Sequence, residues 1–129
     1  MQLSNHTFLV TGAASGLGAA TARRLVTGGA RVLLFDRHAE GVAAMADQLG
    51  ENTLAVAGDV TPETAVAARM RQGQETLGGF SGAINCAGVA LGSRVLAKTG
   101  PHPLPDFVRV LQVNLVGTFN VIRLAAAAM

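Results

Sequence analysis

The chain contains no tyrosine and no tryptophan, and it has one cysteine, Cys86, among its 129 residues. One cysteine excludes an internal disulfide and is typical of a reducing compartment, so we expect a cytoplasmic protein. Charged residues are also scarce, at 14% of the chain with a net charge of +2, and no Lys/Arg cluster predicts binding to nucleic acid. No uninterrupted apolar run approaches the roughly 20 residues that cross a membrane, so we expect no membrane insertion.

Metal-binding patterns are missing too. His6, His38 and His102 lack the spacing of metal ligands, so we expect them to be solvated and predict no metal site. The chain is rich instead in apolar residues, at 50%, and it has 16 glycines. Its length predicts one domain, residues 1–129, able to bury roughly two-thirds of its unfolded surface.

Three glycines stand where a short apolar strand meets a helical pattern. Phe8 to Val10 predict a buried strand, and Gly12, Gly16 and Gly18 follow it with the spacing G-x-x-x-G-x-G. Gly12 permits a tight turn, Gly16 the close approach of a phosphate, and Gly18 close packing of helix on strand. Such a turn presents backbone N–H groups and the positive end of a helix dipole, which suit a pyrophosphate. The stretch therefore predicts nucleotide binding.

Strands and helices alternate along the rest of the chain. Apolar periodicity predicts further strands over residues 30–35, 53–57 and 80–85, and helices over residues 17–26, 39–49, 62–77 and 107–129. Thr61 is expected to cap the third helix, with Pro62 as its first residue. Three prolines between residues 101 and 105 exclude regular structure from residues 89–105. The alternation predicts an α/β fold, a Rossmann-like doubly wound parallel sheet with strand order 3-2-1-4 and flanking helices.

Asp36 ends the second strand, 18 residues after Gly18. In a dinucleotide-binding fold a carboxylate there accepts hydrogen bonds from the adenosine ribose and repels the 2′-phosphate of NADP. Arg37 beside it could offset part of that repulsion by pairing with a phosphate. The alternative is a solvated aspartate in a turn.

Polar residues also follow the third and fourth strands. Asp59 and the segment from Asn85 to Gly88 stand at carboxyl ends of strands, where open α/β sheets bind ligands, although the same residue types favour turns. Cys86 is interpreted as a small core residue and not a nucleophile, because no basic residue stands near it. Asn114 lies on the mostly apolar side of the last helix. Without a catalytic role, it would be a buried packing residue satisfied by a neighbouring loop.

The predicted last helix is apolar on most of its sides. Arg109, Gln112, Asn120 and Arg123 form one polar stripe, and apolar residues fill most of the remaining surface. A helix of this kind needs cover on most sides, whereas four strands offer it one sheet face. We therefore expect the sequence to be part of a larger domain.

Together these motifs resemble the short-chain dehydrogenase/reductase family. The matching segments are residues 11–18 (TGAASGLG), 59–60 (DV), 86–88 (CAG) and 113–119 (VNLVGTF). Within the family, residues 85–88 and 107–124 look most like the type 2 3-hydroxyacyl-CoA dehydrogenases, which act on short 3-hydroxyacyl-CoA thioesters and often on hydroxysteroids. The resemblance implies NAD as cofactor, an acyl-CoA or steroid-like alcohol as substrate, and a homodimer or homotetramer formed through the last helix.

The resemblance also implies roles for individual residues. The residues expected to contact NAD are Gly12, Ser15, Gly16, Leu17, Gly18, Asp36, Asp59, Val60, Cys86 and Gly88. Ser15 and Leu17 would lie against the pyrophosphate, Asp59 and Val60 would bracket the adenine, and the Cys86 backbone would approach the ribose on the nicotinamide side. Asn114 would be the catalytic residue of the last helix, which holds a water of the proton relay.

The family completes its site with a Ser and a Tyr-x-x-x-Lys unit, and that unit is absent here. The chain has no tyrosine, and Lys98, its one lysine, precedes Asn114. Three more strand–helix units would need on the order of 90 further residues. We therefore expect the amino-terminal half of an NAD-dependent enzyme that oxidises a secondary alcohol, inactive by itself. The alternative is a non-catalytic NAD-binding module that acts as a sensor or scaffold.

Overall fold

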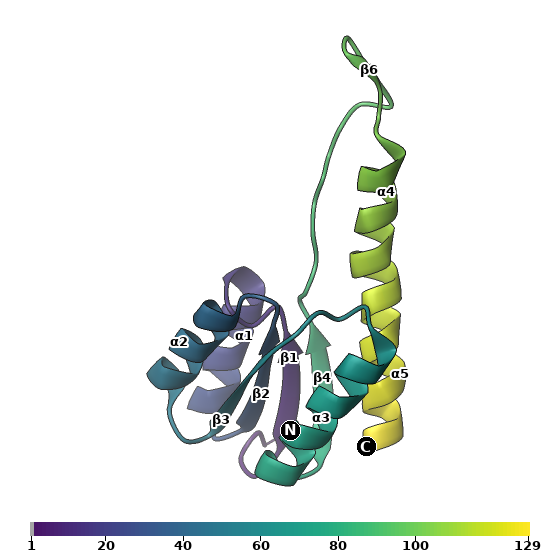
Figure 1. The fold of residues 1–129 in the computed structure, drawn as a ribbon. Coiled ribbons are helices and arrows are strands. Elements are labelled where there is room, and N and C mark those ends of the chain that lie inside the picture. Colours follow the sequence, from purple (N-terminus) through teal and green to yellow (C-terminus); the bar gives the residue numbers. More distant parts are fainter. Residues whose placement is uncertain (1) are drawn as a thin grey trace.

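The computed structural model describes residues 2–129, and its centre is a four-stranded parallel sheet with helices on both faces (Figure 1). The strands are β1 (Thr7–Thr11), β2 (Arg31–Asp36), β3 (Thr53–Ala57) and β4 (Phe80–Asn85). They lie in the order β3-β2-β1-β4, and every neighbouring pair is parallel. The predicted doubly wound α/β sheet and its strand order are confirmed.

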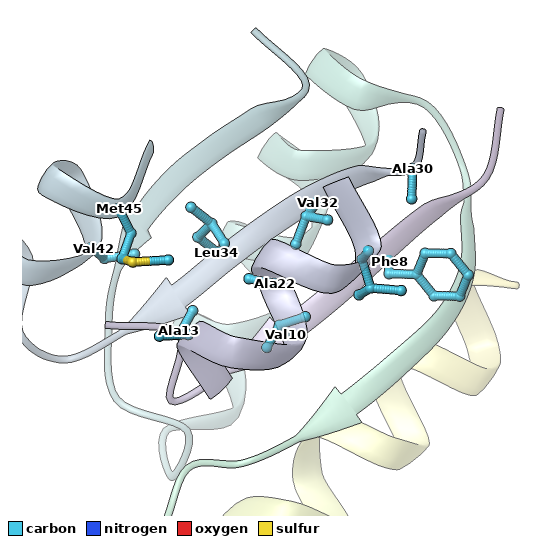
Figure 2. Close-up of a cluster of buried hydrophobic side chains, with 11 residues drawn as sticks. Phe8, Val10, Ala13, Ala22, Ala30, Val32, Leu34, Val42 and Met45 are labelled. Atoms are coloured by element: carbon cyan, nitrogen blue, oxygen red, sulfur yellow. The ribbon is translucent and has the colours of Figure 1, made fainter. Parts of the chain in front are cut away.

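Alternation along the strands divides the core into two layers. On one face, Val10 of β1 lies beside Leu34 of β2, and both pack against α1 (Gly16–Thr27) and α2 (Ala39–Leu49) (Figure 2). On the other face, the intervening residues Leu9 and Leu33 pack against α3 (Glu63–Leu77) and α5 (Thr118–Ala128). Because the strands are covered on both faces, they are almost continuously apolar, as buried parallel strands are.

The start of α3 corrects one prediction. The helix begins at Glu63, and Pro62 is the flanking residue with φ −76° and ψ 118°. Thr61 does not cap the helix; its hydroxyl donates to Oδ1 of Asp59 at 2.8 Å. The competing hydrogen bond within the Asp59–Thr61 turn explains the difference, because short polar side chains favour such local contacts.

Residues 104–128 form one helical rod of three segments. An α-helix, α4 (Leu104–Leu111), leads into a π-helical segment, η1 (Gln112–Gly117), and then into α5. The rod begins three residues earlier than predicted, because Pro105 fits the first helical turn, where its missing N–H is not needed. The π-helical segment has no counterpart in the prediction.

The segment between β4 and α4 is also more regular than predicted. Leu96–Ala97 (β5) and Gly100–Pro101 (β6) pair as a short antiparallel ladder despite the proline. Pro101 is tolerated because a ladder of two residues is all edge. Residues 89–103 thus form an arm that stands with α4 beyond the carboxyl ends of the strands (Figure 1).

Much of the apolar surface of the rod is exposed. Its large exposed apolar side chains are Leu104, Phe107, Val108, Leu111, Leu115, Val116, Phe119 and Ile122. By length and composition alone, Leu104–Ala128 is long and apolar enough to cross a membrane, with a mean hydropathy of 1.4 over 18 residues, although it contains no uninterrupted apolar run of that length. Core helices of soluble proteins share this length and composition, and the rod packs on the sheet through Val121 and Ala125.

Candidate nucleotide-binding cleft

A cleft of about 320 Å³ lies at the carboxyl ends of the strands. It is lined by all ten residues expected to contact the cofactor, which are Gly12, Ser15, Gly16, Leu17, Gly18, Asp36, Asp59, Val60, Cys86 and Gly88. The lining also includes Ala87, from the predicted Asn85–Gly88 segment, and four residues to which the sequence assigned no site role, Phe35, Gly58, Val89 and Val113. Loops after all four strands therefore converge on one cavity, at the point where β1 has β2 on one side and β4 on the other. Open α/β sheets bind ligands at such switch points.

The glycines of the first turn make the approach of its neighbours possible. Gly12 has a φ of +66°, and a Cβ added there would lie 2.7 Å from the carbonyl carbon of Cys86. A Cβ on Gly18 would overlap the carbonyl group of Gly12, so the first turn of α1 packs directly on the end of β1. Gly16, with φ +52°, has open space where a side chain would be. The open space borders the cleft, as an anion site requires.

The amino terminus of α1 supplies free donors to this cavity. The first backbone bond of the helix runs from Ala19 N to Ser15 O at 3.0 Å. The N–H groups of residues 16–18 therefore have no acceptor within the helix. The Ser15 side chain makes no capping bond, and no acidic residue lies in the first turn. Three free donors and the helix dipole together favour a phosphate group.

Asp36 is held in place by the backbone. Its Oδ2 accepts a hydrogen bond from Ala14 N and its Oδ1 from His38 N, each at 2.9 Å. Each carboxylate oxygen has a second acceptor site, so the fixed carboxylate can still receive ribose hydroxyls. Arg37 follows it in the cleft wall.

The other two walls are set by hydrogen bonds to loop residues. Asp59 Oδ1 accepts hydrogen bonds from the Thr61 N–H and hydroxyl, both at 2.8 Å. Asp59 therefore forms a turn and also lines the cleft, so the two interpretations of this residue are compatible. Across the cavity, Thr11 Oγ1 accepts bonds from Cys86 N and Ala87 N at 3.2 Å. Thr11 is buried and does not line the cleft, yet it fixes the segment that does. The sequence indicates such a role only through the position of Thr11 directly before Gly12.

Asn114 lies apart from the cleft lining, and it is exposed, not buried as predicted. Its Oδ1 accepts a bond from Val89 N at 2.8 Å, and its Nδ2 donates to Val89 O at 2.9 Å. Both polar atoms of the Asn114 side chain are thus hydrogen-bonded to the neighbouring loop, as predicted for a packing residue. Val89 lines the cleft, so Asn114 holds its edge from behind.

A second hollow, of about 650 Å³ and mostly apolar, lies between the arm and α4. It shares Val89 with the first cleft and reaches Asn114, Phe107 and His102. Nδ1 of His102 is buried with no hydrogen-bond partner in the described residues, so this nitrogen is not solvated as predicted, although the residue as a whole is half-buried. Among residues 2–129, no three His, Cys, Asp or Glu side chains gather as metal ligands.

Comparison with known proteins places the chain in a family. The family profile described as short chain dehydrogenase matches residues 6–129. The chain is 47% identical over 123 residues to 3-hydroxyacyl-CoA dehydrogenase type-2 of Homo sapiens, covering 94% of this chain and 47% of that protein. It is 43% identical over 129 residues to the Drosophila melanogaster protein of the same name, covering 98% and 51%. The chain thus spans about half the length of the curated relatives it matches.

Solved structures agree with this result. A 3-ketoacyl-(acyl-carrier-protein) reductase from Brucella melitensis complexed with NADH superposes with a TM-score of 0.90 at 30% identity, covering 98% of this chain and 51% of that one. A short-chain dehydrogenase/reductase from the same organism, described as glucose/ribitol dehydrogenase, gives 0.86 at 25%, covering 99% and 51%. Both likenesses extend over nearly the whole of this chain.

Proposed function

The chain belongs to the short chain dehydrogenase family of oxidoreductases, and from that membership we propose that its cleft binds NAD. One observation carries the proposal: four loops, from the ends of four parallel strands, bring three free N–H groups, a fixed carboxylate and an apolar wall into one cavity. In this proposal the pyrophosphate lies on the amino end of α1 and the adenosine lies between Asp36 and Val60. The nicotinamide end lies beside Cys86 and Gly88. The NADH complex of the Brucella reductase supports the choice of ligand.

Asp36 makes the cleft prefer NAD over NADP. A 2′-phosphate placed against this carboxylate is repelled by about 1 kcal/mol in water and about 4 kcal/mol near a protein surface at a separation of about 4 Å. Calorimetric titration of the chain with each dinucleotide measures the preference. Asp36→Ala should narrow it without abolishing NAD binding, because the pyrophosphate is held by backbone donors. Tighter binding of NADP by the unaltered chain would show instead that Arg37 dominates.

We propose further that the whole protein oxidises a 3-hydroxyacyl-CoA with NAD. The relatives at 43–47% identity that bear this activity in their name support the substrate class, with a steroid-like alcohol as second choice. The apolar hollow beside the nicotinamide end is suited to an acyl chain. Asn114 would act there through the Val89 segment and a water of the proton relay.

The 129-residue chain alone should bind NAD but turn over no substrate. Alcohol oxidation needs a base for the hydroxyl proton, general acid–base catalysis contributes about 10² to 10⁴ in rate, and the tyrosine that serves the family is not among these residues. NADH formation from a 3-hydroxyacyl-CoA, followed by absorbance for this chain and for a longer reading frame that includes it, tests both statements. Turnover by the short chain would contradict the first. No turnover by a longer chain that binds NAD would favour the sensor or scaffold alternative.

The exposed apolar stripe of the rod supports a homodimer or homotetramer. Leu115 and Phe119, both 64% exposed, lie on the side of the rod away from the sheet, where a second copy could cover them. Light scattering of the whole protein at micromolar concentration should give a multiple of the monomer mass; a monodisperse monomer would contradict the proposal. Cytoplasmic location, inferred from the single cysteine, stays a prediction.

A further inference from the structure

Val60 of the cleft wall is held from behind by the helical rod. Asn120 Nδ2, at the first turn of α5, donates to Val60 O at 2.9 Å. Gly117, at the end of η1, lies directly beneath the Val60 side chain: an added Cβ would overlap Val60 Cγ2 and lie 3.3 Å from Val60 Cβ. Both contacts are buried, since Gly117, Asn120 and Val60 are all in the buried class.

The Asn120 amide is fixed in the orientation that this contact needs. Its Oδ1 accepts a hydrogen bond from Arg123 Nη2 at 2.9 Å, and the same nitrogen lies 3.0 Å from Glu63 Oε1. Arginine can only donate, so the oxygen of the amide must face Arg123 and the nitrogen must face Val60. Glu63 is the first residue of α3, so the network spans the turn that joins β3 to that helix.

Neither Asn120 nor Gly117 lines the cleft, and the sequence pattern assigned no site role to either. We propose that both are positioning residues, which fix the Val60 backbone and side chain and thereby set the affinity of the adenine end of the cleft. This inference rests on the proposal that the cleft binds NAD. The same rod holds the opposite edge through Asn114 and Val89, so the two ends of the cleft are positioned by two amides of one helix.

The two ends of the cleft can be tested separately with NAD and with ADP-ribose, which lacks the nicotinamide. Asn120→Asp replaces the donor toward Val60 O by an acceptor, and Gly117→Ala pushes on the Val60 side chain. Each variant should lower the affinity for NAD and the affinity for ADP-ribose by the same factor, roughly tenfold. A loss of this size corresponds to one hydrogen bond. Asn114→Ala should weaken NAD more than ADP-ribose, because ADP-ribose lacks the nicotinamide. Gln112→Glu makes the same amide-to-carboxylate exchange on an exposed side of the rod and should change neither by more than about twofold.

The test is calorimetric titration of each folded variant with NAD and with ADP-ribose, with thermal unfolding as the check on folding. The double variant Gly117→Ala/Val60→Ala should bind NAD nearly as well as Val60→Ala alone. The reason is that Val60→Ala removes the Cγ2 methyl group that the Cβ added at Gly117 would overlap. That pair keeps the inference testable if Asn120→Asp does not fold. Unchanged affinities in folded variants, with only the unfolding temperature lowered, would overturn the inference and leave NAD binding intact. An unaltered chain that binds neither ligand would overturn both.

Discussion

Residues 7–88 and residues 89–129 differ in how completely the chain covers its own apolar side chains. In the first region, Leu33 and Leu34 are fully buried between the sheet and its helices. In the second, Leu115 and Phe119 are each 64% exposed although they are as apolar. The first region therefore carries most of the hydrophobic stabilisation within the described residues, whereas the second leaves large apolar side chains in contact with water.

The sharpest test of this contrast removes the same atoms in both regions. Leu34→Ala should lower the free energy of unfolding by about 2–5 kcal/mol, because it leaves a cavity in a closed core. Leu115→Ala removes a side chain that water already reaches, so it should change that free energy by about 0.5 kcal/mol or less. Urea denaturation at low protein concentration measures both, and equal losses would contradict the contrast.

A second test adds one methyl group within the first region. Gly18→Ala forces a Cβ onto the Gly12 carbonyl and should cost about 1–3 kcal/mol of stability together with a large loss of NAD affinity. Gly79→Ala is the matched control, since an added Cβ there meets no atom within 4 Å. Thermal unfolding and NAD titration of the two variants should separate them; equal behaviour would mean that the turn moves away from α1 without cost.

A third test compares two buried threonines at opposite ends of β1, Thr7 at its amino end and Thr11 at its carboxyl end. Thr11→Val removes the hydroxyl acceptor of Ala87 N, while Cys86 N keeps the backbone O of Thr11 at 3.2 Å; Thr7→Val removes a donor to Leu77 O at 3.0 Å. Each should destabilise the chain by about 1–3 kcal/mol, because a buried or half-buried backbone group loses its partner. Only Thr11→Val should also weaken NAD, since it frees a segment of the cleft wall. Equal NAD affinities for the two variants would contradict that difference.

The smallest expected effect concerns the junction of the two regions. Asn114→Ala removes both side-chain bonds to Val89 and should cost about 1 kcal/mol locally. Hydrogen exchange at the Val89 amide should then rise about fivefold, while exchange at β1 and β2 stays unchanged. An unchanged Val89 rate would show that the arm is held by other contacts.

Element boundaries could be predicted from the sequence where the signals are local. The bounds of α2, β3 and β4 follow from the sequence because apolar periodicity and terminal glycines such as Gly50 act locally. The ten cleft residues come together because they end parallel strands or follow the glycine turn, and parallel topology brings such positions to one edge.

What the sequence did not reveal depends on contacts between distant residues. Asn120 looks like one more polar residue of a surface stripe, and its partner, the carbonyl of Val60, is 60 positions away. The apolar neighbours of Asn114 predict that it is buried, yet in the structure Leu115 is exposed and Val113 is half-buried. Pro101 and Pro105 predict irregular structure, although in the fold both occupy positions where no N–H is required.

The π-helical segment has a consequence for insertions and deletions. Each residue of an α-helix turns the chain by about 100°, and a π-helical turn accommodates one residue more than an α-helical turn. Loss of a single residue from 112–117 that restored regular α-helix would therefore leave the rotational phase between α4 and α5 nearly unchanged. Regular α-helix over all six residues would instead rotate α4 by about 100° relative to α5 and turn Asn114 away from Val89 while Asn120 still faced Val60. The π-helical turn thus absorbs one residue and keeps both amides on the sides of the rod that meet their partners.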